Sequence, residues 1–98
     1  MKVINLASEF LKFMVENYHD NFRKAFSFDQ FKALHPDLND SLISDALALL
    51  AKDGFVRVSS YNNIAAIVYL DVVAVQSVEE DTLLRKGYIL VKELLSLL

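Results

Sequence analysis

The chain has 98 residues, of which 54% are hydrophobic, and its ten Lys and Arg against thirteen Asp and Glu give a net charge of −3 at pH 7. A chain of this length supports one core and excludes a second, while an apolar share above the usual ~45–50% indicates that some apolar surface meets a partner. The absence of cysteine excludes a disulfide framework and a thiolate metal site, and the acidic balance gives no overall sign of nucleic-acid binding.

The first predicted element is a helix over residues 3–18, where apolar residues recur at three- and four-residue steps. They form two adjacent apolar stripes, and the charged side chains beside them leave only a narrow polar edge. The first stripe contains Val3, Leu6, Phe10, Phe13 and Met14, and the second contains Ile4, Leu11, Val15 and Tyr18. We expect one stripe to face the core and the other to face a partner.

A short second helix is predicted over residues 28–34. Ser27 and Gln30 have the spacing of a capping box, and Phe26 and Phe31 have that of a hydrophobic staple, so a helix start is expected between them. The helix ends early because the next residue precedes a proline and is therefore disfavoured in the helical region.

A third helix and a hairpin follow. The helix is predicted over residues 39–53, and Gly54 is its stop signal. Residues 55–58 then predict a strand and residues 64–70 the returning strand, with a polar turn between the two.

The last predicted element is a helix over residues 78–97. Ser77 and Glu80 have the capping-box spacing, and the acidic residues 79–81 suit the positive end of a helix dipole. Its apolar residues again form two stripes, one with Leu84, Tyr88, Val91, Leu95 and Leu98 and the other with Leu83, Leu90, Leu94 and Leu97. Together the elements predict a single domain over residues 1–98, mainly α-helical with a small β-hairpin wing, of the α+β class.

Two segments of the sequence are similar to known motifs. Residues 44–56, SDALALLAKDGFV, end in an acid-glycine-apolar-valine step, and residues 83–90, LLRKGYIL, are similar to a leucine-threonine-acid-lysine-glycine segment in which Leu84 replaces the threonine. With its order of elements, nearly the whole chain resembles the winged helix-turn-helix superfamily, in particular small bacterial regulators of the multiple-antibiotic-resistance and phenolic-acid-response type. The resemblance implies a dimeric DNA-binding transcription regulator, and some members of the superfamily are protein-interaction modules instead.

The helices and the hairpin are expected to bury their apolar sides against one another, because the second helix is too short to be stable alone. The sequence does not determine which face of each strand points inward. The expected core contains Leu6, Phe10, Phe13, Phe31, Leu34, Leu42, Ala46, Leu50, Val56, Val58, Ile67 and Val68.

Catalysis and metal binding are not expected. His19 and His35 lie apart in polar segments, and two histidines without a third spaced ligand do not make a zinc site. We expect a surface position for His19, a turn position for His35, no enzyme activity, no cofactor and no metal. The chain start lacks a signal-peptide pattern, and no apolar stretch approaches the ~20 residues that span a bilayer, so a cytoplasmic protein without membrane contact is expected.

Double-stranded DNA is the partner that the resemblance favours. However, the outward side of the predicted recognition helix carries Asp40 and Asp45, where basic groups would be needed to replace phosphate counterions. The alternative is a winged-helix protein-interaction module that has lost DNA binding. If DNA is bound, the contacts are expected from Lys32, Ser41, Ser44, Lys52, Arg57, Ser60, Tyr61, Asn62 and Asn63, with Arg23 and Lys24 as further basic residues at the rim.

A homodimer is also expected, since the second stripes of the first and last helices have no evident destination within the chain. An isologous two-fold contact is the commonest use of such surfaces. The alternative is that the two terminal helices pack on each other within one chain. The expected dimer interface contains Ile4, Leu11, Val15, Leu83, Leu90, Leu94 and Leu97.

Overall fold

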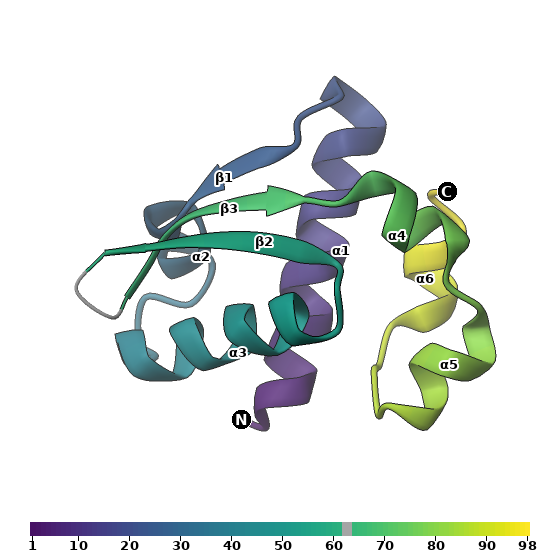
Figure 1. Ribbon diagram of the computed structural model, residues 1–98. Helices are drawn as coiled ribbons and strands as arrows, with labels where there is room; N and C mark the ends of the chain where they lie inside the picture. The colour runs from purple at the N-terminus through teal and green to yellow at the C-terminus, as the bar shows by residue number, and fades with distance from the viewer. Residues whose placement is uncertain (62–63) are drawn as a thin grey trace.

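The computed structural model describes residues 1–61 and 64–98, and the side chains of residues 1–60 and 66–98. The part described is mainly helical with a small antiparallel sheet, which is the α+β class that the sequence predicts. The elements in chain order (Figure 1) are α1 (Val3–Asn21), β1 (Ala25–Ser27), α2 (Phe28–Leu34), α3 (Asp40–Lys52), β2 (Val56–Tyr61), β3 (Ile64–Leu70), α4 (Val72–Ser77), α5 (Glu80–Arg85) and α6 (Val91–Leu95).

The sheet adds a third strand to the predicted hairpin. β3 is central, and β1 and β2 both run antiparallel to it. Phe26 of β1 lies opposite Val68, and Val68 lies opposite Val58 of β2. The sequence predicts residues 25–27 only as the approach to a helix. They form a strand in which Phe26 is buried and both neighbours are exposed, the alternation of a half-buried strand.

The start of α2 has both predicted features, and its bounds are the predicted ones. Gln30 Oε1 accepts a hydrogen bond from the backbone nitrogen of Ser27 at 2.8 Å, which closes the capping box. The ring centroids of Phe26 and Phe31 lie 6.1 Å apart across the helix start. These local contacts fix the angle at which β1 enters α2.

α3 begins and ends one residue inside its predicted bounds. Asn39 caps its start by accepting a hydrogen bond from the backbone nitrogen of Leu42 at 2.8 Å. Beyond its end, Gly54 has a φ of +85°, the left-handed conformation that glycine adopts most easily. The glycine turns the chain from α3 into β2.

Most of the predicted core is buried or half-buried. The prediction is wrong for Leu34 and Ile67, which have 43% and 41% of their surface exposed. Leu34 is the last residue of α2, and Ile67 precedes the buried Val68 on β3, so alternation turns Ile67 to the opposite face. The fully buried large side chains are Phe10, Phe26, Phe31, Leu6, Leu11, Met14, Ile43, Leu47, Leu50, Leu83, Val15 and Val68.

α1 lies between two parts of the fold, with the sheet, α2 and α3 on one side and α4 to α6 on the other (Figure 1). Toward α2, the ring of Phe10 packs against that of Phe31 at 4.9 Å between centroids. On the other side, Ile4 lies against Gly87, and α6 is in contact with α1. Both predicted stripes of α1 therefore pack within the chain. No helix in the described residues is long and apolar enough to cross a membrane.

The single C-terminal helix predicted over residues 78–97 is wrong, because the chain forms two short helices there, α5 and α6, after the further short helix α4 that the sequence did not predict. Gly87, with a φ of +92°, and Leu90, with a φ of +59°, are left-handed and interrupt the helical backbone. The predicted cap Ser77 instead ends α4, where its Oγ donates to the carbonyl oxygen of Val73 at 2.7 Å. The apolar period continues through the breaks because buried residues of all three helices join one core cluster.

Polar contacts attach the C-terminal region to α1 and to the end of α3. Tyr88 Oη donates a hydrogen bond to Asp53 Oδ2 at 2.7 Å, and Lys86 Nζ lies 3.1 Å from Asp53 Oδ1. The hydroxyl of Ser8, which is buried, donates to a carbonyl oxygen one turn earlier in α1 at 2.8 Å and accepts from the backbone nitrogen of Ile89 at 3.0 Å. These contacts orient the segment between α5 and α6.

Candidate binding surfaces

The exposed side of α3 is acidic in the N-terminal half of the helix. Asp40 and Asp45 are both exposed. Lys32 of α2 is not a free cation here, because its Nζ lies 3.1 Å from Asp40 Oδ1 and donates to the carbonyl oxygen of Leu38. Three of the predicted DNA-contacting residues lie on α3 and are exposed or half-buried: Ser41, Ser44 and Lys52.

The strand residues of the predicted DNA site do not join those of α3. Val56 and Val58 turn toward the core, on which α3 packs, so Arg57 between them points to the opposite face of the sheet. Ser60 is exposed on β2 beyond an irregularity in the strand register. The other wing residues lie outside the side chains that the structure describes: Tyr61, Asn62 and Asn63.

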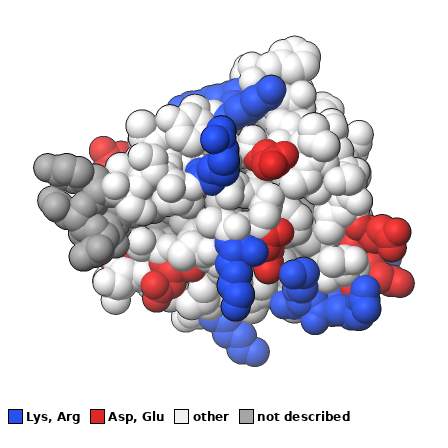
Figure 2. All heavy atoms as spheres, in the orientation of Figure 1, with Lys and Arg blue, Asp and Glu red and all other residues white. Residues whose placement is uncertain are grey.

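Basic residues gather on the outer face of the sheet instead. The guanidinium of Arg57 lies 5.6 Å from the ring centroid of its cross-strand neighbour Tyr69. Lys24 and Arg23 lie at the entry to β1, and Lys24 Nζ is 5.9 Å from the ring centroid of Tyr18. Figure 2 shows blue side chains over the upper part of this face, with a red one beside them. The sequence contains these cations, but their common location is visible only in three dimensions. The strand register pairs Arg57 with Tyr69, Lys24 lines a hollow with Arg57, and Arg23 lines a hollow with Ile67.

The residues predicted for a dimer interface are largely inside the chain. α1 and α6 are in contact, so the terminal segments pack on each other within one chain, as the alternative to a dimer predicts. This packing covers the apolar residues that were assigned to the dimer interface. A dimer would therefore have to use other residues. The buried members of the set are Leu11, Val15, Leu83 and Leu94, and the half-buried members are Ile4, Leu90 and Leu97.

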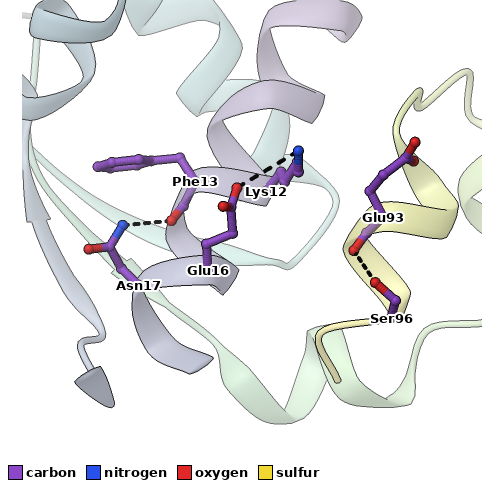
Figure 3. Close-up of polar contacts among 6 residues, drawn as sticks. All are labelled: Lys12, Phe13, Glu16, Asn17, Glu93 and Ser96. Atoms are coloured by element: carbon purple, nitrogen blue, oxygen red, sulfur yellow. Dashed lines mark hydrogen bonds and ion pairs between the residues drawn. The ribbon is translucent and has the colours of Figure 1, made fainter. Parts of the chain in front are cut away.

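A groove of about 390 Å³ lies beside α1, between α2 and the segment that precedes α6. Within it, Nε2 of His35 lies 3.2 Å from Oε2 of Glu9, and Nζ of Lys12 lies 4.0 Å from Oε1 of Glu16. Figure 3 shows the Lys12–Glu16 pair with α6 beside this part of α1. Because these groups are paired with one another, the groove presents no obvious anchor for a charged ligand. His19 is exposed, as predicted.

The buried phenol Tyr88 is a structural group. Burial raises its pKa well above the usual range, and the hydrogen bond to Asp53 and the charge of that carboxylate act in the same direction. The phenol therefore stays neutral and serves as a hydrogen-bond donor. Within the described residues, no group of three or more His, Cys, Asp or Glu is placed to hold a metal ion.

Comparison of the chain with family models, with curated proteins and with solved structures finds no match.

Proposed function

We propose that the chain is a non-catalytic binding module of the winged helix-turn-helix class that engages a protein rather than duplex DNA. The class is supported by the order of the elements: α1, a short β1, the pair α2 and α3 joined by a tight turn, and the hairpin of β2 and β3. The sheet order β1-β3-β2 brings the short strand beside the hairpin, which agrees with the sequence resemblance.

The charge on α3 is the observation that carries the preference for a protein. In helix-turn-helix proteins the second helix of the pair enters the major groove, where its exposed residues meet phosphates and base edges. Here that helix presents Asp40 and Asp45, and the nearby cation Lys32 is already paired with Asp40. Lys52 lies at the other end of the helix. Because the Lys32–Asp40 pair carries no net charge, it offers no attraction to a phosphate, and Asp45 adds a carboxylate that would repel the phosphates that binding has to engage.

The non-catalytic part of the proposal rests on the side chains that the sequence supplies. There is no cysteine. The imidazole of His19 lies beside Asp20 and that of His35 beside Glu9, and these two carboxylates are on separate parts of α1. Neither pair has a serine or threonine hydroxyl recorded within hydrogen-bond distance among the described residues. A base without a nucleophile does not make a catalytic set.

Fluorescence anisotropy of a labelled random-sequence duplex, across about 50 to 200 mM salt, tests the choice between DNA and protein. We expect no binding at the lowest salt. The double variant Asp40→Lys and Asp45→Lys serves as a positive control, since it should gain weak, salt-sensitive binding if α3 is presented as in other helix-turn-helix proteins. Tight wild-type binding that weakens steeply with salt would establish the DNA-binding regulator that the sequence favours.

A homodimer remains part of the proposal, with different residues from those predicted. The support that is left is the exposed apolar surface of the C-terminal region, which includes Leu84, Ile89 and Leu98. Light scattering gives the mass in solution, and Leu84→Glu should convert a dimer to a monomer without unfolding the chain. A monomeric wild-type protein at high concentration would end this part of the proposal.

A further inference from the structure

We propose that the outer face of the sheet is the surface through which the module binds its partner, and that the partner contributes an extended acidic segment with an aliphatic or aromatic side chain. The inference rests on the proposed function and adds the site and the chemistry of the partner. This surface, the sheet face, consists of Arg57, Ile67 and Tyr69 on the strands, with Arg23 and Lys24, which precede β1 and line hollows with Ile67 and Arg57, respectively.

The centre of the sheet face is apolar and uncovered. Ile67 and Tyr69 are two residues apart on the central strand β3 and are 41% and 38% exposed. The intervening Val68 points into the core, where α3 packs against the sheet. An isoleucine and a tyrosine side by side on a central strand form a continuous apolar strip, which is the kind of surface that partners cover.

The cations around this strip are held in place by neutral groups. Arg23 Nε donates to the carbonyl oxygen of Ala25 at 3.0 Å, Arg23 Nη2 donates to Gln30 Oε1 at 2.6 Å, and the guanidinium lies 5.0 Å from the ring centroid of Phe26. Arg57 lies over Tyr69. Within the described residues, the ion pairs within 4.0 Å do not include Arg23, Lys24 or Arg57. Their charges are therefore ordered but uncompensated, which suits a carboxylate from outside.

Two hollows on this side of the molecule each combine a cation with an apolar wall. One, of about 460 Å³, is lined by Arg23, Ala25, Phe26, Ser27, Gln30 and Ile67. The other, of about 380 Å³, is lined by Lys24, Arg57, Leu70, Asp71, Val72 and Val73. They share no lining residue, so an extended segment could place a side chain in each. The carboxylate in the second hollow, Asp71, accepts a hydrogen bond from the backbone nitrogen of Ala74 at 3.0 Å and so caps α4.

An acidic protein segment fits these features better than a nucleic acid does. The sheet face has three cations with one carboxylate beside them, on a chain whose net charge is −3, whereas a nucleic-acid strand needs a basic track that follows successive phosphates. A phosphate backbone also has no apolar group that would contact Ile67. A peptide in which acids alternate with apolar residues supplies carboxylates to the cations and a side chain to the apolar strip at once.

The test uses fluorescein-labelled extended peptides in which Glu alternates with Leu and Phe, measured by anisotropy against the whole chain. The matched probes carry Lys in place of Glu, or Ser in place of Leu and Phe, and oligothymidylate is the single-stranded nucleic acid. We expect the Glu peptide alone to bind. Arg57→Glu and Ile67→Ser should each weaken its binding roughly ten-fold, while Arg85→Glu, the same charge change on α5, should leave it unaltered.

The outcomes separate this inference from the proposed function. No binding of the Glu peptide up to about 1 mM, tighter binding of oligothymidylate, or equal binding by Arg57→Glu and wild type would each overturn the sheet-face assignment. If Lys52→Glu on α3 weakens binding of the Glu peptide and the sheet-face variants do not, the module binds protein through α3 and the sheet-face assignment is overturned. Duplex binding in the earlier experiment removes the proposed function itself. Arg57→Gln is the second variant if the charge reversal lowers thermal stability, and a smaller loss of binding is expected from it.

Discussion

The two regions of the fold, residues 1–70 and 71–98, share one core cluster but are built differently. The first contains the long helices α1 and α3, of 19 and 13 residues, and all three strands. The second consists of three helices of five or six residues each. Helices this short are unstable in isolation, so the second region depends on its packing against α1 and its contacts with the end of α3.

The difference teaches where the fold's stability comes from. In the first region, backbone pairing, caps and core packing support one another. In the second, a few side chains carry the attachment, chiefly Leu83, Tyr88 and Leu94. We therefore expect damage to the first region to unfold the whole chain and damage to the second to release residues 71–98 first.

Phe31→Ala should have the largest effect. The ring of Phe31 is fully buried, with centroids 4.9, 5.8 and 6.1 Å from those of Phe10, Phe13 and Phe26. Removing it should cost about 3 to 5 kcal/mol of unfolding free energy, from lost burial and from the cavity. Urea unfolding followed by both circular dichroism and tyrosine fluorescence should show one shared transition, and separate midpoints would contradict the expected unity of this region.

Leu83→Ala should have the next largest effect, lowering the free energy of unfolding by about 2 to 5 kcal/mol. Leu83 is fully buried but lies on α5, which the second region can release. Hydrogen exchange should therefore show faster exchange of amides in residues 80–95 while the amides of α3 keep their wild-type protection. Equal acceleration in α3 and α5 would mean that the two regions unfold as one unit.

Tyr88→Phe should lower the free energy of unfolding by about 1 to 2 kcal/mol, because Asp53 loses a hydrogen bond but keeps its ion pair with Lys86. The raised pKa of Tyr88 also sets a pH dependence. Above pH about 10 the phenol ionises in the unfolded chain and not in the folded one, so wild-type stability should fall there. Chemical denaturation at rising pH should find the difference between wild type and Tyr88→Phe shrinking, and a constant difference would count against the buried, neutral phenol.

Gly87→Ala should have the smallest effect, about 1 kcal/mol, and Gly54→Ala is its matched control. Both glycines have a positive φ, and an added Cβ meets only an ordinary contact with Ile4 at Gly87 and nothing within 4 Å at Gly54. Backbone strain is then the whole effect in each case. Gly54→Ala should destabilise the entire chain, whereas Gly87→Ala should speed exchange in α5 and α6 only; the same pattern from both would erase the distinction between the regions.

Local signals explain which elements could be predicted from the sequence. α2 follows from Ser27, Gln30 and the proline after it, and α3 ends at Lys52, one residue before its predicted bound and just ahead of the expected turn at Gly54. In residues 78–97, the apolar period alone cannot distinguish one long helix from two short ones that pack on the same core. Gly87 carries the missing information, since a basic residue followed by glycine is a common helix end.

The candidate site was harder to predict for a different reason. Ile67 and Val68 are both apolar, so the sequence does not reveal which of them faces the core. That choice decides the side on which Arg57 lies, because strand register pairs it with Tyr69, two residues beyond Ile67. The basic residues were therefore visible in the sequence, but their common surface depends on three-dimensional pairing.

The position of α1 has a consequence for the way the protein is made. α1 leaves the ribosome before the partners on either of its sides, and the residues that cover its second apolar stripe are synthesised after the whole sheet. During that interval the side of α1 that includes Ile4 lacks both Gly87 and α6, which lie against it in the finished protein. A nascent chain paused after β3 should therefore be a target for chaperones that recognise exposed aliphatic helices, and it should lose that recognition once α6 has emerged.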